Sequence, residues 1–263
     1  MKQMGWLFSV IAACTVILAG CSGVKQAATT TAVPTIELNI AAAVSLKDVL
    51  IEAQKNYESK NHNVKLILNL GGSGSLQRQI EQGAPVDVFI PADSKYLDEL
   101  GTNNLINKET RIDLARNTLV LVVPKSSSLK FNGFADLTQE SVQRLAIGEP
   151  ISVPAGRYGV QVLQRLGIQE KVKGKEIYAK DVRNVLAYVE TENVDAGIVY
   201  NTDALTSNKV KVIATAPKDL HEPIIYSAAV LSGIKQQKAA EDFVAYLASD
   251  EGKEIFKKYG FSK

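Results

Sequence analysis

Cysteine and histidine are rare in this chain of 263 residues, which contains two of each. With so few of them, a metal centre built from cysteine and histidine is not expected. His62 and His221 both stand in polar segments typical of solvated turns, and no pair of nucleophile and base is apparent for an enzyme. The net charge of +2 is too small for the basic surface that nucleic-acid binding requires. The composition therefore favours neither a cation site, nor catalysis, nor a nucleic-acid partner.

The N-terminus has the order of a secretory signal. Lys2 precedes an apolar run over residues 5–19, which is shorter than the roughly 20 residues of a membrane span. The next stretch, Leu18-Ala19-Gly20-Cys21, resembles the cleavage box of bacterial lipoproteins. This resemblance implies that the chain is cut before Cys21 and that the Cys21 thiol is acylated. The alternative is an uncleaved N-terminal anchor helix with an incidental cysteine.

We therefore expect a signal peptide at residues 1–20 and a lipidated tether at residues 21–34. The tether sequence after the cysteine, SGVKQAATTTAVP, is small and polar. Its thirteen residues, fully extended, span at most about 45 Å, so the folded part would stay close to the outer face of the membrane. Cys14 would leave with the signal, which leaves Cys21 alone and makes an internal disulfide impossible. The expected location is the outer face of the cell membrane or the periplasm.

Segments typical of strands and of helices alternate through the rest of the chain. Strands are expected at residues 36–40, 64–70, 86–90, 118–123, 144–147, 176–178, 196–199, 210–214 and 224–231. Helices are expected at residues 45–59, 75–82, 94–100, 155–166, 182–191 and 235–259. This alternation predicts an α/β fold with mostly parallel sheets flanked by helices.

The apolar strands at 119–123 and 224–230 are candidates for two crossings between lobes. We therefore expect a hinged, two-lobed molecule, with lobe 1 at residues 35–120 and 226–263 and lobe 2 at residues 121–225.

Small residues follow several of the expected strands, at the carboxyl ends where open α/β sheets bind ligands. In four places they open an expected helix: at Ser45, an expected N-cap; at Gly71 to Ser75; at Val153 to Gly156; and at Asp181, the expected N-cap before Val182. A further expected strand ends at Tyr200. Helix N-termini expose unpaired N–H groups with partial positive charge, and small residues let a ligand approach them. Taken singly, these residues would be read as caps, turns or packing residues. Together they predict an anion site made of neutral donors, without arginine or lysine.

The same segments resemble the extracytoplasmic molybdate-binding proteins of ABC importers, a branch of the type II periplasmic binding proteins. The resemblance covers nearly all of residues 36–262. It rests on seven ordered stretches: AAAVSL from Ala41, GSGSL from Gly72, QIEQGAPVDVF from Gln79, VPAGRY from Val153, DVR from Asp181, GIVY from Gly197 and IFKKYGF from Ile255.

The resemblance implies a ligand, a partner and a set of contacts. The implied ligand is molybdate, with tungstate beside it; no cofactor is implied, and the implied partner is the membrane permease of an ABC importer. The expected form is a monomer. The implied contacts are the hydroxyl and N–H of Ser45, Ser73, the N–H groups of Ala155 and Val182, and Tyr200.

Three alternatives remain open at this stage. One is a receptor of the same fold for another oxyanion, such as sulfate or phosphate, or for a small metabolite. The second is an exported enzyme that uses one of the two histidines. The third is an adhesion or structural lipoprotein without a small ligand.

Overall fold

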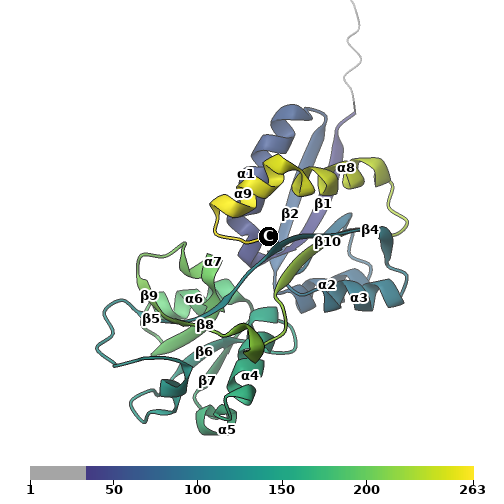
Figure 1. Cartoon of the computed structure of the whole chain (residues 1–263). Helices are drawn as coiled ribbons and strands as arrows, with labels where there is room; N and C mark the ends of the chain where they lie inside the picture. The colour runs from purple at the N-terminus through teal and green to yellow at the C-terminus, as the bar shows by residue number, and fades with distance from the viewer. Residues whose placement is uncertain (1–33) are drawn as a thin grey trace, which may run out of the picture. The chain divides into compact units, whose positions relative to one another are not determined.

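The structure is a computed structural model that describes residues 34–263 (Figure 1). The expected signal peptide, Cys21 and the tether up to residue 33 lie outside the described residues. Within residues 34–263, no helix combines the length and the apolar character needed to cross a membrane.

The first sheet has five strands in the order β2-β1-β3-β10-β4. β1 pairs in parallel with β2 and β3, whereas β10 pairs antiparallel with β3 and β4. The sheet is therefore mixed, and its parallel part is limited to three strands. The strands are β1 (Ile36–Ala43), β2 (Val64–Gly71), β3 (Val88–Ile90), β4 (Ile106–Arg116) and β10 (Ile225–Leu231).

Helices cover both faces of this sheet because its central strands are apolar on both sides. Side chains alternate along a strand, so Leu38 and Ile40 lie in one hydrophobic core and Ala41 lies in another. The first core includes α1 (Lys47–Lys60), α8 (Gln237–Ala248) and α9 (Asp250–Lys258). The second includes α2 (Ser73–Glu81) and α3 (Lys95–Thr102).

The second sheet repeats this plan, with the strand order β7-β6-β8-β5-β9. β6 pairs in parallel with β7 and β8, and β5 pairs antiparallel with β8 and β9. The strands are β5 (Leu119–Pro124), β6 (Leu145–Gly148), β7 (Glu176–Ala179), β8 (Ala196–Tyr200) and β9 (Val210–Thr215). The helices are α4 (Pro154–Arg165), α5 (Gln169–Val172), α6 (Val182–Glu190) and α7 (Asn201–Ala204); the 3₁₀ helices of the chain are η1 (Val44–Leu46), η2 (Phe134–Thr138) and η3 (Lys218–Leu220).

The chain passes between the sheets twice, which gives the two lobes seen in Figure 1. Asn117 and Thr118 join β4 to β5, and residues 216–224 join β9 to β10. The two passages run side by side, because the Asn117 N–H donates to the Ile224 carbonyl at 3.2 Å. The C-terminal helices then return to the first lobe. The expected two-lobed α/β fold is confirmed, but each sheet is mixed where a mostly parallel one was expected, because β10 and β5 pair antiparallel with both of their neighbours.

Several details of the secondary structure differ from the expectations. The predicted strands omit β4, an edge strand whose many exposed polar residues hide its apolar ones. The helix expected at 235–259 is divided at Ser249, whose Oγ accepts the Gly252 N–H at 3.2 Å and so starts α9. The strands expected to cross at 119–123 and 224–230 do not cross, because β5 lies wholly in the second sheet and β10 lies wholly in the first. Leu119 and Val120 therefore belong with the second sheet and not with lobe 1.

Candidate functional site

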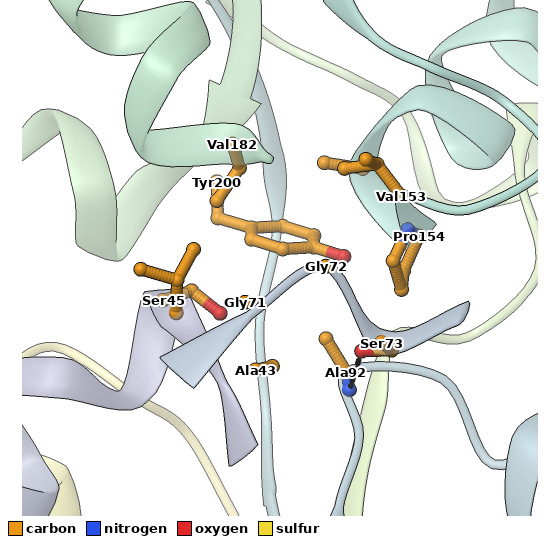
Figure 2. Close-up of a pocket in the computed structure, with 12 residues that line it drawn as sticks. Ala43, Ser45, Gly71, Gly72, Ser73, Ala92, Val153, Pro154, Val182 and Tyr200 are labelled. Carbon is orange, nitrogen blue, oxygen red and sulfur yellow. Dashed lines mark hydrogen bonds between the residues drawn. The ribbon is translucent and has the colours of Figure 1, made fainter. Parts of the chain in front are cut away.

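A small cavity lies between the two lobes, with a volume of about 200 Å³ that includes space open to solvent. Ser45, Ser73, Ala155, Val182 and Tyr200, the five residues that the sequence predicts as ligand contacts, all line it (Figure 2). All five are buried, each with at most 3% of its surface exposed. The other lining residues are Ala43, Val44, Gly71, Gly72, Ala92, Val153 and Pro154. None of these twelve described residues carries a charge.

Two hydroxyl groups at the cavity have protons available for a ligand. Ser73 Oγ accepts the Ala92 N–H at 3.1 Å, so its own proton is free to point elsewhere. Tyr200 Oη is buried and has no hydrogen-bond partner. Figure 2 shows the Tyr200 ring extending across the cavity, with its hydroxyl on the side of Ser73 and Pro154. Burial raises the pKa of Tyr200 well above its ordinary value, so this hydroxyl keeps its proton and acts as a donor.

Three α-helices begin at the cavity wall. Ser73 is the first residue of α2, Ala155 the second residue of α4 and Val182 the first residue of α6. N–H groups in the first turn have no acceptor within their own helix, and they carry the positive end of its dipole. Pro154 at the first position of α4 is preorganised for the turn, and the Asp181 side chain accepts the Asn184 N–H at 2.9 Å as an N-cap. The cavity is therefore a cluster of neutral donors.

Ser45 reaches the cavity in a different way from the one expected. It is not an N-cap, because it is the middle residue of η1, whose N-cap is Ala43. The Ser45 side chain lies 2.9 Å from the hydroxyl of Tyr226, a buried residue of β10. The short 3₁₀ turn therefore directs the Ser45 hydroxyl to the cavity edge, and a tertiary contact holds it there.

Charged residues lie outside the cavity and connect the lobes. Arg157 of α4 pairs with Asp93 of the first lobe at 2.5 Å, and it also pairs with Glu222 of the second passage. Arg183 of α6 pairs with Asp48 of α1 at 2.6 Å. Two ion pairs thus hold the lobes against each other, which is the arrangement of a closed state.

Arg183 has a second acidic neighbour within its own lobe. Its Nε lies 2.6 Å from Asp203 Oδ1, close enough for an ion pair, although the N–H is not directed along a hydrogen bond. Asp203 is fully buried, and this burial raises its pKa to about 6 in spite of the arginine.

Two glycines of the first lobe permit the close contact between the lobes. The Gly74 N–H donates to the Ser152 carbonyl of the second lobe at 2.9 Å. A Cβ on Gly74 would lie 2.9 Å from Ser152 Cα, and one on Gly72 would lie 2.9 Å from the Lys180 carbonyl oxygen. The glycines in GGSGS therefore admit the backbone of the opposite lobe.

The two histidines differ from each other. His62 is exposed, as expected of a solvated turn residue. The same expectation is wrong for His221, which is 6% exposed. Its ring packs edge-on against Tyr158, with 5.9 Å between ring centroids, and its Nδ1 lies 2.7 Å from the Glu222 carbonyl oxygen. His221 therefore supports the second passage between the lobes and does not line the cavity.

The sequence reasoning missed the residues that connect the lobes. Arg157 and Arg183 each follow a predicted cavity residue by one or two positions, on the first turn of α4 and α6. An arginine at a helix start is unfavourable for the dipole, so it needs another reason to be there. That local conflict is the signal that could have identified both arginines.

The proteins to which this chain is similar are named as solute-binding or substrate-binding proteins. Residues 38–262 match the family model described as bacterial extracellular solute-binding protein. The chain is 44% identical over 246 residues to the lipoprotein YvgL of Bacillus subtilis (strain 168), whose name assigns it provisionally to ABC transporter substrate-binding proteins; the match covers 94% of this chain and 93% of YvgL. It is 38% identical over 235 residues to the molybdate-binding protein ModA of Escherichia coli (strain K12), covering 86% of this chain and 89% of ModA.

A solved structure gives the same relationship. It is the substrate-binding domain of a transporter from Clostridium difficile, provisionally named a molybdenum ABC transporter. The TM-score is 0.68 at 42% sequence identity, covering 87% of this chain and 99% of that domain. All of these relatives are named as binding proteins, and none is named as an enzyme. The chain therefore belongs to the family of bacterial extracellular solute-binding proteins.

Proposed function

We propose that this protein captures molybdate between its two lobes and delivers it to the permease of an ABC importer, with tungstate as a second ligand. The observation that carries the proposal is the small, uncharged cavity in which hydroxyl and N–H donors converge. Relatives named as molybdate-binding proteins support the choice of anion.

The donor set suits a dianion that carries no proton. Neutral dipoles stabilise its charge without a buried counter-ion, which would itself have to be desolvated. Phosphate at neutral pH carries at least one proton, and this O–H would find no acceptor among donors. Sulfate carries no proton but is smaller than molybdate, so some donors would be left without a partner, at about 1–3 kcal/mol each.

Calorimetric titration of the purified mature chain with molybdate, tungstate, sulfate and phosphate tests this assignment. We expect molybdate and tungstate to bind most tightly, and each to raise the melting temperature of the chain at saturating concentration. Tightest binding of sulfate or phosphate would refute the ligand and favour a receptor for another oxyanion. Absence of binding and of any thermal shift would favour a structural lipoprotein.

We further propose that the protein acts as a monomer held at the membrane by acylated Cys21. A single chain supplies all five predicted contacts, and YvgL, a relative, is named a lipoprotein. Lobe closure on the anion, about the two passages near Asn117 and residues 216–224, would present the permease with a closed surface. The mass of the mature N-terminus tests the acylation, and light scattering of the mature chain tests the monomer.

A further inference from the structure

A chain of hydrogen bonds leads from the passage between the lobes, where Asn117 is half-buried, to the buried cavity. It begins at Asn117, continues through the hydroxyl of Tyr226 and ends at Ser45. Neither Asn117 nor Tyr226 lines the cavity, and neither is among the predicted ligand contacts. Tyr226 is fully buried, with its ring edge-on to Tyr200 and to Phe261. Its hydroxyl is therefore held in one position behind Ser45.

The direction of each proton in this chain follows from a backbone group. The Thr118 N–H donates to Asn117 Oδ1 at 2.9 Å, and because an N–H can only donate, this contact fixes which end of the amide is oxygen. The amide nitrogen, which can only donate, then lies 2.8 Å from Thr202 Oγ1 and 3.3 Å from Tyr226 Oη. Tyr226 Oη therefore accepts from Asn117.

The remaining steps follow from counting donors. The Tyr226 hydroxyl has one proton, which it keeps because burial raises its pKa above the ordinary value. Among the described residues, Asn117 and Ser45 are the hydrogen-bond partners of Tyr226 Oη, and Asn117 can only donate to it, so Ser45 Oγ at 2.9 Å is the acceptor available for the Tyr226 proton. Ser45 Oγ is thereby the acceptor, and its own proton is left for the cavity. Ser73 is in the same state, because it accepts the Ala92 N–H.

We propose that Tyr226, oriented by Asn117, is a specificity-determining residue that holds the Ser45 hydroxyl as a donor to the bound oxyanion, a role that rests on the proposed function. Without the Tyr226 proton, the Ser45 hydroxyl can rotate and present a lone pair to the ligand. A site with such a lone pair repels an unprotonated dianion and accepts the O–H of a protonated one. Tyr226 is thus a positioning residue: it excludes protonated oxyanions without touching them.

A double-mutant cycle tests this role, using Tyr226→Phe, Ser45→Ala and the double variant. Titrations use whichever of molybdate, tungstate, sulfate and phosphate the wild type binds most tightly. We expect Tyr226→Phe to weaken binding about ten-fold, which corresponds to one hydrogen bond of about 1.4 kcal/mol. In the Ser45→Ala background the same substitution should change binding less than two-fold, because the hydroxyl on which it acts is gone. Losses that multiply in the double variant would overturn the proposal.

A second measurement separates positioning from a general loosening of the fold. Tyr226→Phe should weaken molybdate binding while leaving phosphate binding unchanged or stronger, so the ratio of the two affinities narrows. Equal weakening of both would show a merely structural effect. Tyr158→Phe is the matched control: its ring is also buried, but its hydroxyl lies 3.4 Å from the Pro223 carbonyl and not at the cavity. It should leave the ratio unchanged.

Asn117→Asp carries the same test if Tyr226→Phe does not fold. The aspartate keeps an acceptor for Thr118 but turns the donor beside Tyr226 into an acceptor, which draws the tyrosine proton away from Ser45. Asn117→Asp should weaken binding less in the Ser45→Ala background than in the wild type, because the part of the loss that acts through the Ser45 hydroxyl disappears. Repulsion between the new carboxylate and the anion is present in both backgrounds. If the wild type binds molybdate but the losses of binding free energy in the double-mutant cycle are additive, the role of Tyr226 is refuted and the proposed function stands. A wild type that binds none of the four oxyanions removes both proposals.

Discussion

Alanine at Gly74 should weaken ligand binding without weakening the fold. Gly74 is the second residue of α2, and its N–H donates to the Ser152 carbonyl of the opposite lobe at 2.9 Å. The new Cβ would lie 2.9 Å from Ser152 Cα and 3.2 Å from the carbonyl oxygens of Ile151 and Ser152. These are backbone atoms, which cannot rotate away as a flexible side chain could. The lobes must therefore remain slightly apart in the closed state.

The magnitude follows from the cost of overpacking, which is typically about 1–3 kcal/mol. If the open, ligand-free state leaves the methyl group in solvent, this cost falls on closure alone and weakens binding by about 5- to 150-fold. The ligand-free chain should be as stable as the wild type, or more stable by up to about 1 kcal/mol, because alanine favours a helix over glycine. The two effects have opposite signs, which distinguishes blocked closure from misfolding.

Calorimetry gives the affinity, and a thermal melt without ligand gives the stability. Gly101→Ala is the matched control, since Gly101 also lies in a helix of the first lobe, α3. Its new Cβ would contact Lys108 Cε at 3.2 Å, near the end of a flexible side chain. Unchanged affinity in Gly74→Ala, or an equal loss in Gly101→Ala, would refute the argument that this glycine permits closure.

Three further predictions concern the Tyr200 hydroxyl, the Arg157–Asp93 ion pair and the buried Asp203. Tyr200→Phe should weaken molybdate binding by about 1.5–3 kcal/mol while raising or preserving the melting temperature of the ligand-free chain, because it removes a buried hydroxyl without a partner. Arg157→Gln should weaken binding more than Asp93→Asn, since it leaves a buried carboxylate without a counter-charge, whereas Arg157 keeps Glu222 when Asp93 is neutralised; equal losses would contradict this order. The melting temperature of Asp203→Asn, measured relative to that of the wild type, should rise as the pH is raised from about 4 to about 6. Burial raises the pKa of Asp203 from 3.8 to about 6, so the folded wild type retains a proton that the unfolded chain has released, and its stability falls as pH rises through this window; a constant difference would contradict the assignment.

The sequence predicts the cavity residues well because their signals are local. A small residue at a strand end and a helix start at the next position are both visible in a short segment, and parallel strands bring such segments to one edge. Pro154 and Asp181 mark the starts of two helices before any tertiary contact is known. Ala155 and Val182 contribute through the backbone, so their apolar side chains carry no sign of this role except their position.

The remaining features depend on contacts between distant segments. Ser45 follows the small residues as a cap would, but its partner is Tyr226, 181 positions away. The edge strand β4 lacks a continuous apolar run, because its exposed face is polar and only one neighbour pairs with it. His221 stands in a polar segment, yet packing against Tyr158 buries it. None of these arrangements can be derived from the residues beside them.

The separation of charges from the cavity has a functional consequence. In the proposed function, neutral donors inside the cavity bind the anion, whereas the pairs Arg157–Asp93 and Arg183–Asp48 act between the lobes outside it. A positive charge inside the cavity would favour any anion, including protonated phosphate, and would have to be desolvated in the empty site. Outside the cavity, the same charges favour closure of the lobes. The selectivity among anions then depends on the direction in which the hydroxyl protons of the cavity point. That direction is set by groups such as Ala92 and Tyr226, which lie behind the contacts and give each hydroxyl a single role.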